Sequence, residues 1–115
     1  MALIKNLYID QGTSFAATTT VTNRLLSSDL DLSNSTIYAH IKKSSESTTI
    51  TASFHCTYIL ETHTLIIYLN DNETAAIFPG RYEYDVIVKD SNRNSTIRIM
   101  EGLVTINSGV TKING

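Results

Sequence analysis

The stretch from Ile77 to Lys89 constrains the fold of this 115-residue chain most strongly, and it reads Ile-Phe-Pro-Gly-Arg-Tyr-Glu-Tyr-Asp-Val-Ile-Val-Lys. Pro79 and Gly80 signal a turn, because proline fixes φ and glycine permits a positive φ. After the turn, alternate residues are aromatic or β-branched: Tyr82, Tyr84, Val86 and Val88. This period of two is typical of a β-strand that buries one face, so residues 81–89 are predicted to form a central strand.

The turn and its tyrosines predict a structural corner. In immunoglobulin-like β-sandwiches, a tyrosine just after such a corner turns its hydroxyl back onto the backbone. The residues expected at this corner are Pro79, Gly80, Tyr82 and Tyr84. The alternation also predicts that Tyr82 and Val86 are buried, whereas Glu83 faces solvent.

Similar alternation recurs along the chain and predicts further strands. They cover residues 3–9, 14–22, 36–42, 48–58, 65–69 and 96–107. In the fourth predicted strand, the side chains expected to point inward are Ile50, Ala52, Phe54 and Cys56. Residues 70–76 indicate one capped helical turn that crosses between sheets, and residues 23–35 indicate a loop laid over the sandwich. Gly102 is predicted to mark a bulge or a close approach of two backbones.

Short strands separated by turn signals, without a long helical pattern, predict an all-β fold. We expect an antiparallel immunoglobulin-like β-sandwich of about seven to eight strands. With 115 residues, the chain is long enough for one two-layer core, so residues 1–115 are predicted to form a single domain.

The composition bounds the partners and the compartment. A hydrophobic fraction of 42% with 17% charged residues indicates a globular chain, and a net charge of −2 gives no electrostatic reason to bind nucleic acid or an anionic membrane. The first residues lack a signal-peptide layout, and no apolar run approaches the ~20 residues of a membrane helix. We therefore expect a soluble protein that is made in a cytoplasm.

Residues capable of catalysis or metal binding are present but do not form a recognised pattern. His55 and His63 flank one predicted hairpin and Glu61 lies nearby, yet their spacing matches no zinc motif. The sequence also lacks a nucleophile elbow, a phosphate-binding glycine loop and a His-Glu-x-x-His motif. We expect no enzymatic activity, no metal and no cofactor. The single cysteine, Cys56, is interpreted as a buried small hydrophobe, with a reactive thiol as the alternative.

Several apolar side chains exceed what one buried strand face requires. Tyr8, Tyr38, Tyr58 and Tyr68 lie on strands whose other face is aliphatic, and they fit either the rim of the sandwich or a subunit contact. The candidate subunit contacts at the two ends of the chain are Leu3, Ile4, Val110 and Ile113. The alternative is that both terminal segments complete the sheets of this domain.

The sequence resembles small virion structural proteins of tailed bacteriophages. The resemblance lies in Ile9-Asp-Gln-Gly12, Leu30-Asp-Leu32, Phe78-Pro-Gly-Arg-Tyr-Glu-Tyr-Asp-Val86, Arg98-x-x-Glu-Gly102 and Val110-Thr111. It is similar to the N-terminal domains of upper baseplate proteins, and it implies an immunoglobulin-like sandwich placed in a virion. It transfers no functional residue, because its motifs are structural.

The resemblance implies a non-enzymatic adaptor or accessory subunit of the tail or baseplate. Such a subunit acts through contacts with other virion proteins, in a symmetric homo- or hetero-oligomeric assembly. A capsid decoration protein, or a free carbohydrate- or peptide-binding module, is the alternative. A carbohydrate site would normally use exposed tryptophan or clustered aromatic residues, and the chain has no tryptophan.

Overall fold

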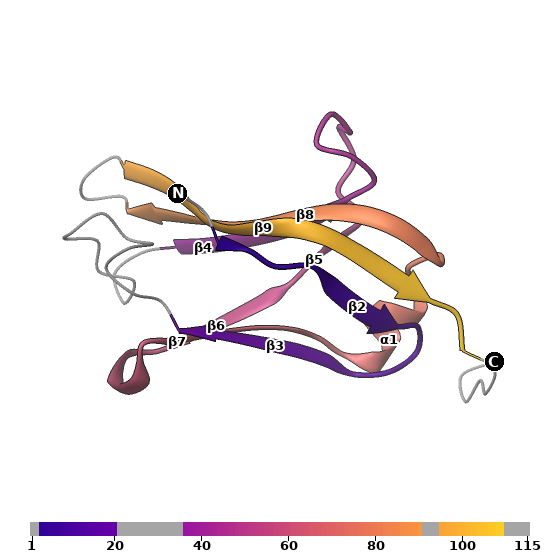
Figure 1. Ribbon diagram of the computed structural model, residues 1–115, viewed down its shortest axis with the longest axis horizontal. Helices are drawn as coiled ribbons and strands as arrows, with labels where there is room; N and C mark the ends of the chain where they lie inside the picture. Colours follow the sequence, from indigo (N-terminus) through magenta and orange to yellow (C-terminus); the bar gives the residue numbers. More distant parts are fainter. Residues whose placement is uncertain (1–2, 21–35, 91–94, 110–115) are drawn as a thin grey trace.

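The computed structural model describes residues 3–20, 36–90 and 95–109, which form two β-sheets packed face to face (Figure 1). The elements are β1 (Leu3–Ile4), β2 (Leu7–Asp10), β3 (Phe15–Thr20), β4 (Thr36–Lys42), β5 (Ala52–Ser53), β6 (His55–Ile59), the 3-10 helix η2 (Leu60–Thr62), β7 (Thr64–Leu69), α1 (Asp71–Ala75), β8 (Gly80–Asp90) and β9 (Ser95–Asn107). The large sheet has the order β1-β9-β8-β4-β5, with β2 also paired to β9, and the small sheet has the order β3-β7-β6. The predicted all-β sandwich is confirmed.

The core lies between the two sheets and is built from the alternate residues of each strand. Tyr82, Tyr84, Val86 and Val88 from β8 are 7%, 4%, 0% and 0% exposed, so the predicted register of this central strand is confirmed. Opposite them, β7 of the small sheet buries Leu65, Ile67 and Leu69. Full burial of one such side chain contributes about 1.5–3 kcal/mol, which makes this layer the main source of stability.

The corner before β8 has the expected tyrosine geometry. The hydroxyl of Tyr82 donates a 2.7 Å hydrogen bond to the carbonyl oxygen of Phe78, four residues upstream. Gly80 has a φ of 144°, which a residue with a side chain rarely adopts. The hydroxyl of Tyr84 instead donates a 2.5 Å bond to the carbonyl oxygen of Lys5, and burial raises the pKa of Tyr84 to about 12.

The predicted first strand is interrupted, and its pairing is parallel rather than antiparallel. Both β1 and β2 pair in parallel with β9, with Leu3 opposite Met100 and Leu7 opposite Val104. Between them the Lys5 carbonyl turns inward to Tyr84, and the side-chain oxygen of Asn6 accepts a 3.1 Å bond from the Leu103 amide. The first segment therefore stays beside β9 along its length, although Lys5 and Asn6 interrupt the strand between β1 and β2.

Gly102 permits this break because a side chain there would collide with the first segment. A Cβ at Gly102 would lie 2.3 Å from the Lys5 carbonyl oxygen. The close backbone approach predicted for Gly102 is confirmed, but the bulge lies elsewhere. The β8–β9 register shifts between Val86 and Ile87, which face Met100 and Arg98, so Ile99 is the extra residue.

The prediction of one strand over residues 48–58 is wrong, because this segment forms two short strands in different sheets and crosses from one sheet to the other at Phe54. β5 pairs with β4 in the large sheet, whereas β6 pairs with β7 in the small sheet. Between them the Phe54 amide donates a 2.8 Å bond to Ala39, and the Phe54 ring is buried against Tyr84. Ile50, expected inside, is 44% exposed, because residues 43–51 project from the sandwich as a loop (Figure 1).

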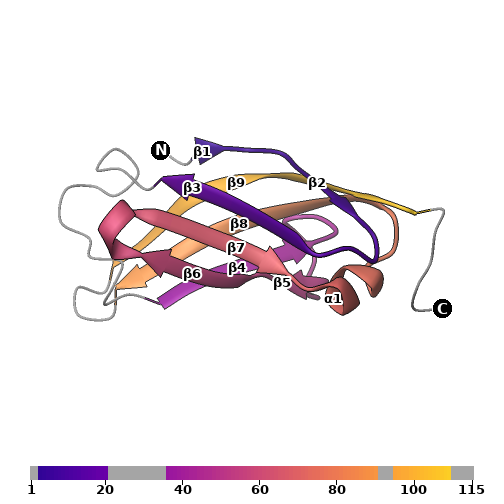
Figure 2. The same ribbon diagram turned by 90° about the horizontal axis from the view of Figure 1, so that it is seen from below.

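The helical turn predicted after β7 is confirmed and closes one end of the sandwich (Figure 2). Asn70 caps α1, and its side chain accepts a 2.9 Å bond from the Glu73 amide while the Glu73 carboxylate accepts one from the Asn70 amide. Gln11, in the turn after β2, donates to the carbonyl oxygens of Ala75 (3.2 Å) and Ile77 (3.0 Å). These bonds tie the β2–β3 turn to the corner that precedes β8.

Candidate functional site: a hollow on the outer face of the large sheet

The solvent-facing side of the large sheet carries a hollow of about 720 Å³. Its floor comes from the residues of β8 that alternate with the buried ones, including Glu83, Asp85 and Ile87. β9 contributes Arg98 and Glu101, and β4 contributes His40 and Lys42. The same period-two pattern that builds the core therefore also builds this outer face, which we call the outer hollow.

Residues from four strands stand in one row across the outer hollow. Ile4 of β1 lies opposite Glu101 of β9, Glu101 opposite Asp85 of β8, and Asp85 opposite His40 of β4. Directly opposed residues on one face have Cβ atoms about 4.5–5.5 Å apart, close enough to act together on one bound group. Strand pairing thus assembles residues that lie far apart in the sequence.

The row contains two neighbouring carboxylates, and among the described residues only one of them has a cationic partner. Asp85 and Glu101 are like charges in directly opposed positions, an arrangement that destabilises a sheet. The Nε atom of Arg98 lies 3.0 Å from the Oδ2 atom of Asp85, with the two side chains 53% and 32% exposed. A pair this exposed contributes at most about 1 kcal/mol, so it offsets only part of the repulsion between Asp85 and Glu101 and does not anchor the fold.

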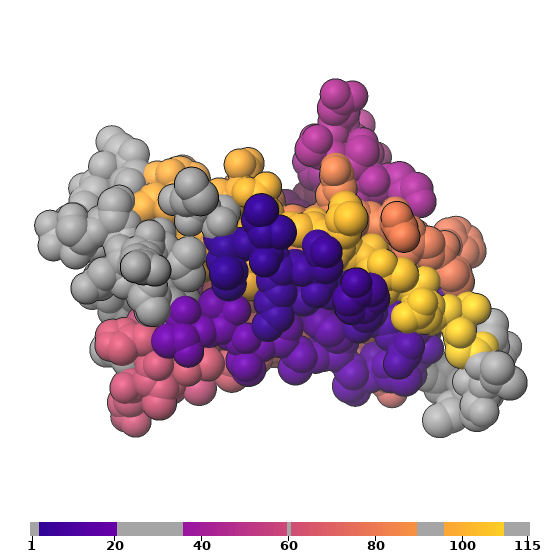
Figure 3. All heavy atoms as spheres, viewed as in Figure 1, coloured from indigo at the N-terminus to yellow at the C-terminus, as the bar shows by residue number. Residues whose placement is uncertain are grey.

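The loop of residues 43–51 borders the outer hollow through Ser45 and forms its wall there. Figure 3 shows this loop as a lobe that stands above the neighbouring surface. The Ser45 amide donates a hydrogen bond to the Glu83 carboxylate. Lys43 donates a 3.2 Å bond to the Arg81 carbonyl oxygen, and its ammonium lies 4.7 Å from the centre of the Tyr82 ring. The loop is therefore braced against β8 at several points, which keeps the wall in place. Glu83, expected to face solvent, is half-buried beneath it.

Apolar side chains form the rim on the β1 side. Ile4 is 74% exposed and Leu103 is 42% exposed, and both line the outer hollow. The outer hollow therefore combines exposed aliphatic area on one side with a charged floor. Ile4 is one of the candidate subunit contacts predicted from the sequence.

The other predicted contacts are placed as follows. The backbone of Leu3 completes the large sheet beside β9, as the alternative interpretation expected, while its side chain stays 40% exposed. Val110 and Ile113 lie outside the described residues. Among the tyrosines, Tyr8, Tyr38 and Tyr68 are 68%, 46% and 40% exposed. Their role in subunit contact stays a prediction.

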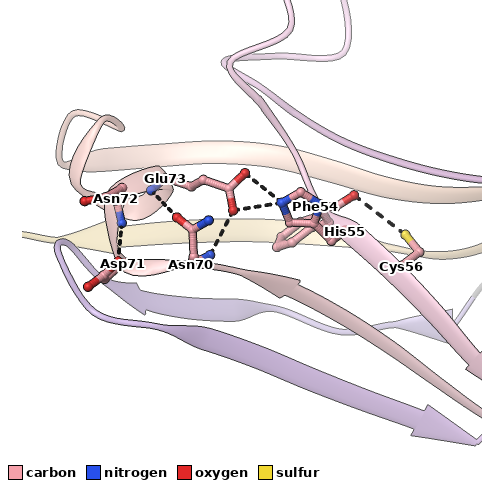
Figure 4. Close-up of polar contacts among 7 residues, drawn as sticks. All are labelled: Phe54, His55, Cys56, Asn70, Asp71, Asn72 and Glu73. Carbon is pink, nitrogen blue, oxygen red and sulfur yellow. Dashed lines mark hydrogen bonds and ion pairs between the residues drawn. The ribbon is translucent and has the colours of Figure 1, made fainter.

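The histidines lie apart from one another. His40 lines the outer hollow, whereas His63 bonds to the Tyr58 hydroxyl at 3.0 Å. The Nε2 atom of His55 lies 2.8 and 2.9 Å from the two carboxylate oxygens of Glu73, so β6 is tied to the cap of α1 (Figure 4). In the part of the chain that the structure describes, no group of three His, Cys, Asp or Glu side chains could hold a metal ion.

Hydrogen bonding and burial shift the pKa values of two side chains near this cap, Glu73 and Cys56. The backbone bond from Asn70, and then His55, lower the pKa of the Glu73 carboxyl below its ordinary value. Cys56 is half-buried against the core, and burial raises the pKa of its thiol to about 11. Such a thiol is a poor nucleophile near neutral pH, which favours the interpretation of Cys56 as a packing residue.

The outer hollow was missed at the sequence level, although part of its signal is visible there. The residues of β8 that face it alternate with the core residues and carry charges of both signs. Which residues of β1, β4 and β9 join them depends on strand pairing and register, and local patterns do not contain this information.

Comparison with known proteins identifies no family for this chain. No protein-family model and no curated protein matches the sequence. Among solved structures, the crystal structure of Listeria monocytogenes InlP is similar, with a TM-score of 0.49 and 20% identity. The similarity covers 90% of this chain and 26% of that one, so the chain spans about a quarter of the InlP chain. At this level the likeness carries no information about function. Within the described residues, no helix is long and apolar enough to cross a membrane.

Proposed function

We propose that this protein is a non-enzymatic assembly module that binds a partner protein through the outer hollow. We further propose that it is an adaptor or accessory subunit in the tail or baseplate of a tailed bacteriophage. The observation that carries the first proposal is the hollow itself, which combines an exposed aliphatic rim with a braced wall.

The physical argument concerns the cost of association. Binding immobilises side chains and loops, and each ordered side chain costs about 0.5–1.5 kcal/mol. Here the floor belongs to strands with a buried opposite face, and the wall is already bonded to β8 through Ser45 and Lys43. A partner would therefore meet a surface that needs little further ordering. Exposed aliphatic groups such as Ile4 offer apolar area that this domain does not bury by itself.

The assignment to a virion rests on the sequence resemblance. Gln11, in the first of its motifs, bonds to the carbonyl oxygens of Ala75 and Ile77, which lie just before the motif that begins at Phe78. These hydrogen bonds give the two segments a common structural role, because they hold one end of the sandwich closed. On this proposal the partners are other virion proteins in a symmetric assembly, and the protein is made in the host cytoplasm and then incorporated into the particle.

The test uses particles of the phage whose genome encodes the chain. Wild-type protein is expected in purified particles at a fixed copy number, measured by quantitative mass spectrometry. The double variant Ile4→Ser, Leu103→Ser should fold normally and yet be depleted from particles, because it removes the apolar rim. The matched control is Ile59→Ser on β6, which removes an aliphatic side chain of similar exposure (39%) from the small sheet.

Absence of the wild-type protein from particles would overturn the virion assignment. Normal incorporation of the double variant would overturn the use of the outer hollow. If the purified protein instead bound a glycan and stayed outside particles, the alternative of a free binding module would replace the proposal.

A further inference from the structure

We infer that the occupant of the outer hollow is a segment of a partner protein that places a lysine or arginine side chain against Glu101, with apolar residues against Ile4 and Leu103. This inference deepens the proposed function and rests on it. It names the chemistry of the partner, which the proposed function leaves open.

The first argument is the charge left over in the hollow. Its lining contains the carboxylates of Glu83, Asp85 and Glu101 and the fixed cations of Lys42 and Arg98. Glu83 accepts the Ser45 amide and stands directly opposite Lys42 in the β4–β8 pair, and Asp85 pairs with Arg98. Within the described residues the side chain of Glu101 has neither a hydrogen bond nor an ion pair. One carboxylate therefore stands unpaired in the centre of the row.

The second argument is that this carboxylate stands opposite a like charge of the same sheet. Glu101 stands directly opposite Asp85, and like charges in that position oppose strand pairing. A neutral residue at position 101 would suit the isolated sheet better. A cationic group from outside, placed beside Glu101, would convert this repulsion into attraction. Stability of the domain and binding to the partner are therefore expected to respond in opposite directions to changes at this residue.

The third argument is the placement of the apolar residues around Glu101. Ile4 lies opposite Glu101 on the neighbouring strand, and Leu103 follows two residues later on the same face of β9. An incoming ammonium or guanidinium would thus be flanked by aliphatic groups, which exclude water and strengthen the ion pair. Phosphate groups of nucleic acids or anionic lipids would instead meet the unpaired carboxylate, so a basic protein segment fits better than either.

The experiment is a charge series at one position. The experiment compares purified wild-type protein with the variants Glu101→Gln and Glu101→Lys, two at a time. Each mixture is added to particles produced without the gene for this protein, and mass spectrometry measures the ratio of the two proteins bound to the particles. We expect binding in the order wild type, Gln, Lys, with a loss of roughly tenfold or more at the first step. The advantage of the wild type over Gln should shrink between low and high salt concentration, because salt screens the pair. Glu61→Lys, an exposed residue of η2 with the same change in net charge, should bind like the wild type.

Chemical denaturation separates this effect from misfolding. Both variants should unfold at denaturant concentrations equal to or above that of the wild type, since the repulsion with Asp85 is removed. Equal or stronger binding of either variant would overturn the inference and leave the proposed function intact. If the wild-type protein itself does not join particles, the proposed function fails, and the inference fails with it.

Discussion

Gly102→Ala is the substitution from which the structure predicts the clearest loss of stability. The added Cβ would lie 2.3 Å from the carbonyl oxygen and 2.9 Å from the carbonyl carbon of Lys5. Real Cβ atoms do not approach backbone atoms this closely, so the segment between β1 and β2 must move away from β9. This segment is backbone, and it cannot relieve the clash by changing a rotamer.

The magnitude follows from the hydrogen bonds that depend on this approach. Tyr84 bonds to the Lys5 carbonyl oxygen at 2.5 Å, the Lys5 amide bonds to Glu101 at 2.9 Å, and the Leu103 amide bonds to Asn6 at 3.1 Å. At about 0.5–1.5 kcal/mol each, their loss lowers the free energy of unfolding by roughly 2–4 kcal/mol. For a domain of this size, that lowers Tm by on the order of 10 °C.

Urea unfolding followed by circular dichroism measures the effect, with two comparisons. Tyr84→Phe removes one of the three bonds without a clash and should cost about 1 kcal/mol. Gly12→Ala meets no atom within 4 Å, but Gly12 has a φ of +83°, so this variant reports backbone strain alone, about 1–2 kcal/mol. An unchanged unfolding midpoint for Gly102→Ala would refute the close approach of β9 to the first segment.

Three further predictions concern the corner, the thiol and the cap of α1. Tyr82→Phe should lower the free energy of unfolding by about 1 kcal/mol, measured by urea denaturation, because the 2.7 Å bond to Phe78 is lost; no loss would contradict the corner bond. Cys56 should react slowly with a thiol reagent at pH 8 in native protein and quickly in urea, because its pKa is raised to about 11; equal rates would contradict its burial. The pKa of Glu73 is lower in the folded state, so its stabilising effect should be present above the ordinary pKa and lost as the pH falls through the folded value. Accordingly, Glu73→Gln should lose less stability than the wild type between pH 7 and pH 3, and an equal loss would contradict the linkage.

Features that depend on neighbouring residues could be predicted from the sequence. The alternation after Pro79 places Tyr82 and Val86 in the core, and both are buried. The cap of α1 follows from the spacing of Asn70 and Glu73, because both partners lie within one helical turn. These elements carry their own signals, and tertiary contacts did not override them.

Features that depend on distant residues could not be predicted in the same way. The break at Lys5 requires the hydroxyl of Tyr84 and the bare backbone of Gly102, which only the folded sheet brings together. The change of sheets at Phe54 lies inside a continuous apolar alternation that reads as one strand. The outer hollow combines both difficulties, since strand register alone decides that Glu101 faces Asp85.

A density map of the intact particle, obtained by electron cryomicroscopy, tests the central proposal most directly. It should show this sandwich with the outer face of its large sheet covered by a neighbouring protein, and with a lysine or arginine of that neighbour beside Glu101. A particle in which the sandwich is present but this face is open to solvent would contradict the proposed use of the outer hollow. A complete particle without the sandwich would contradict the assembly role itself.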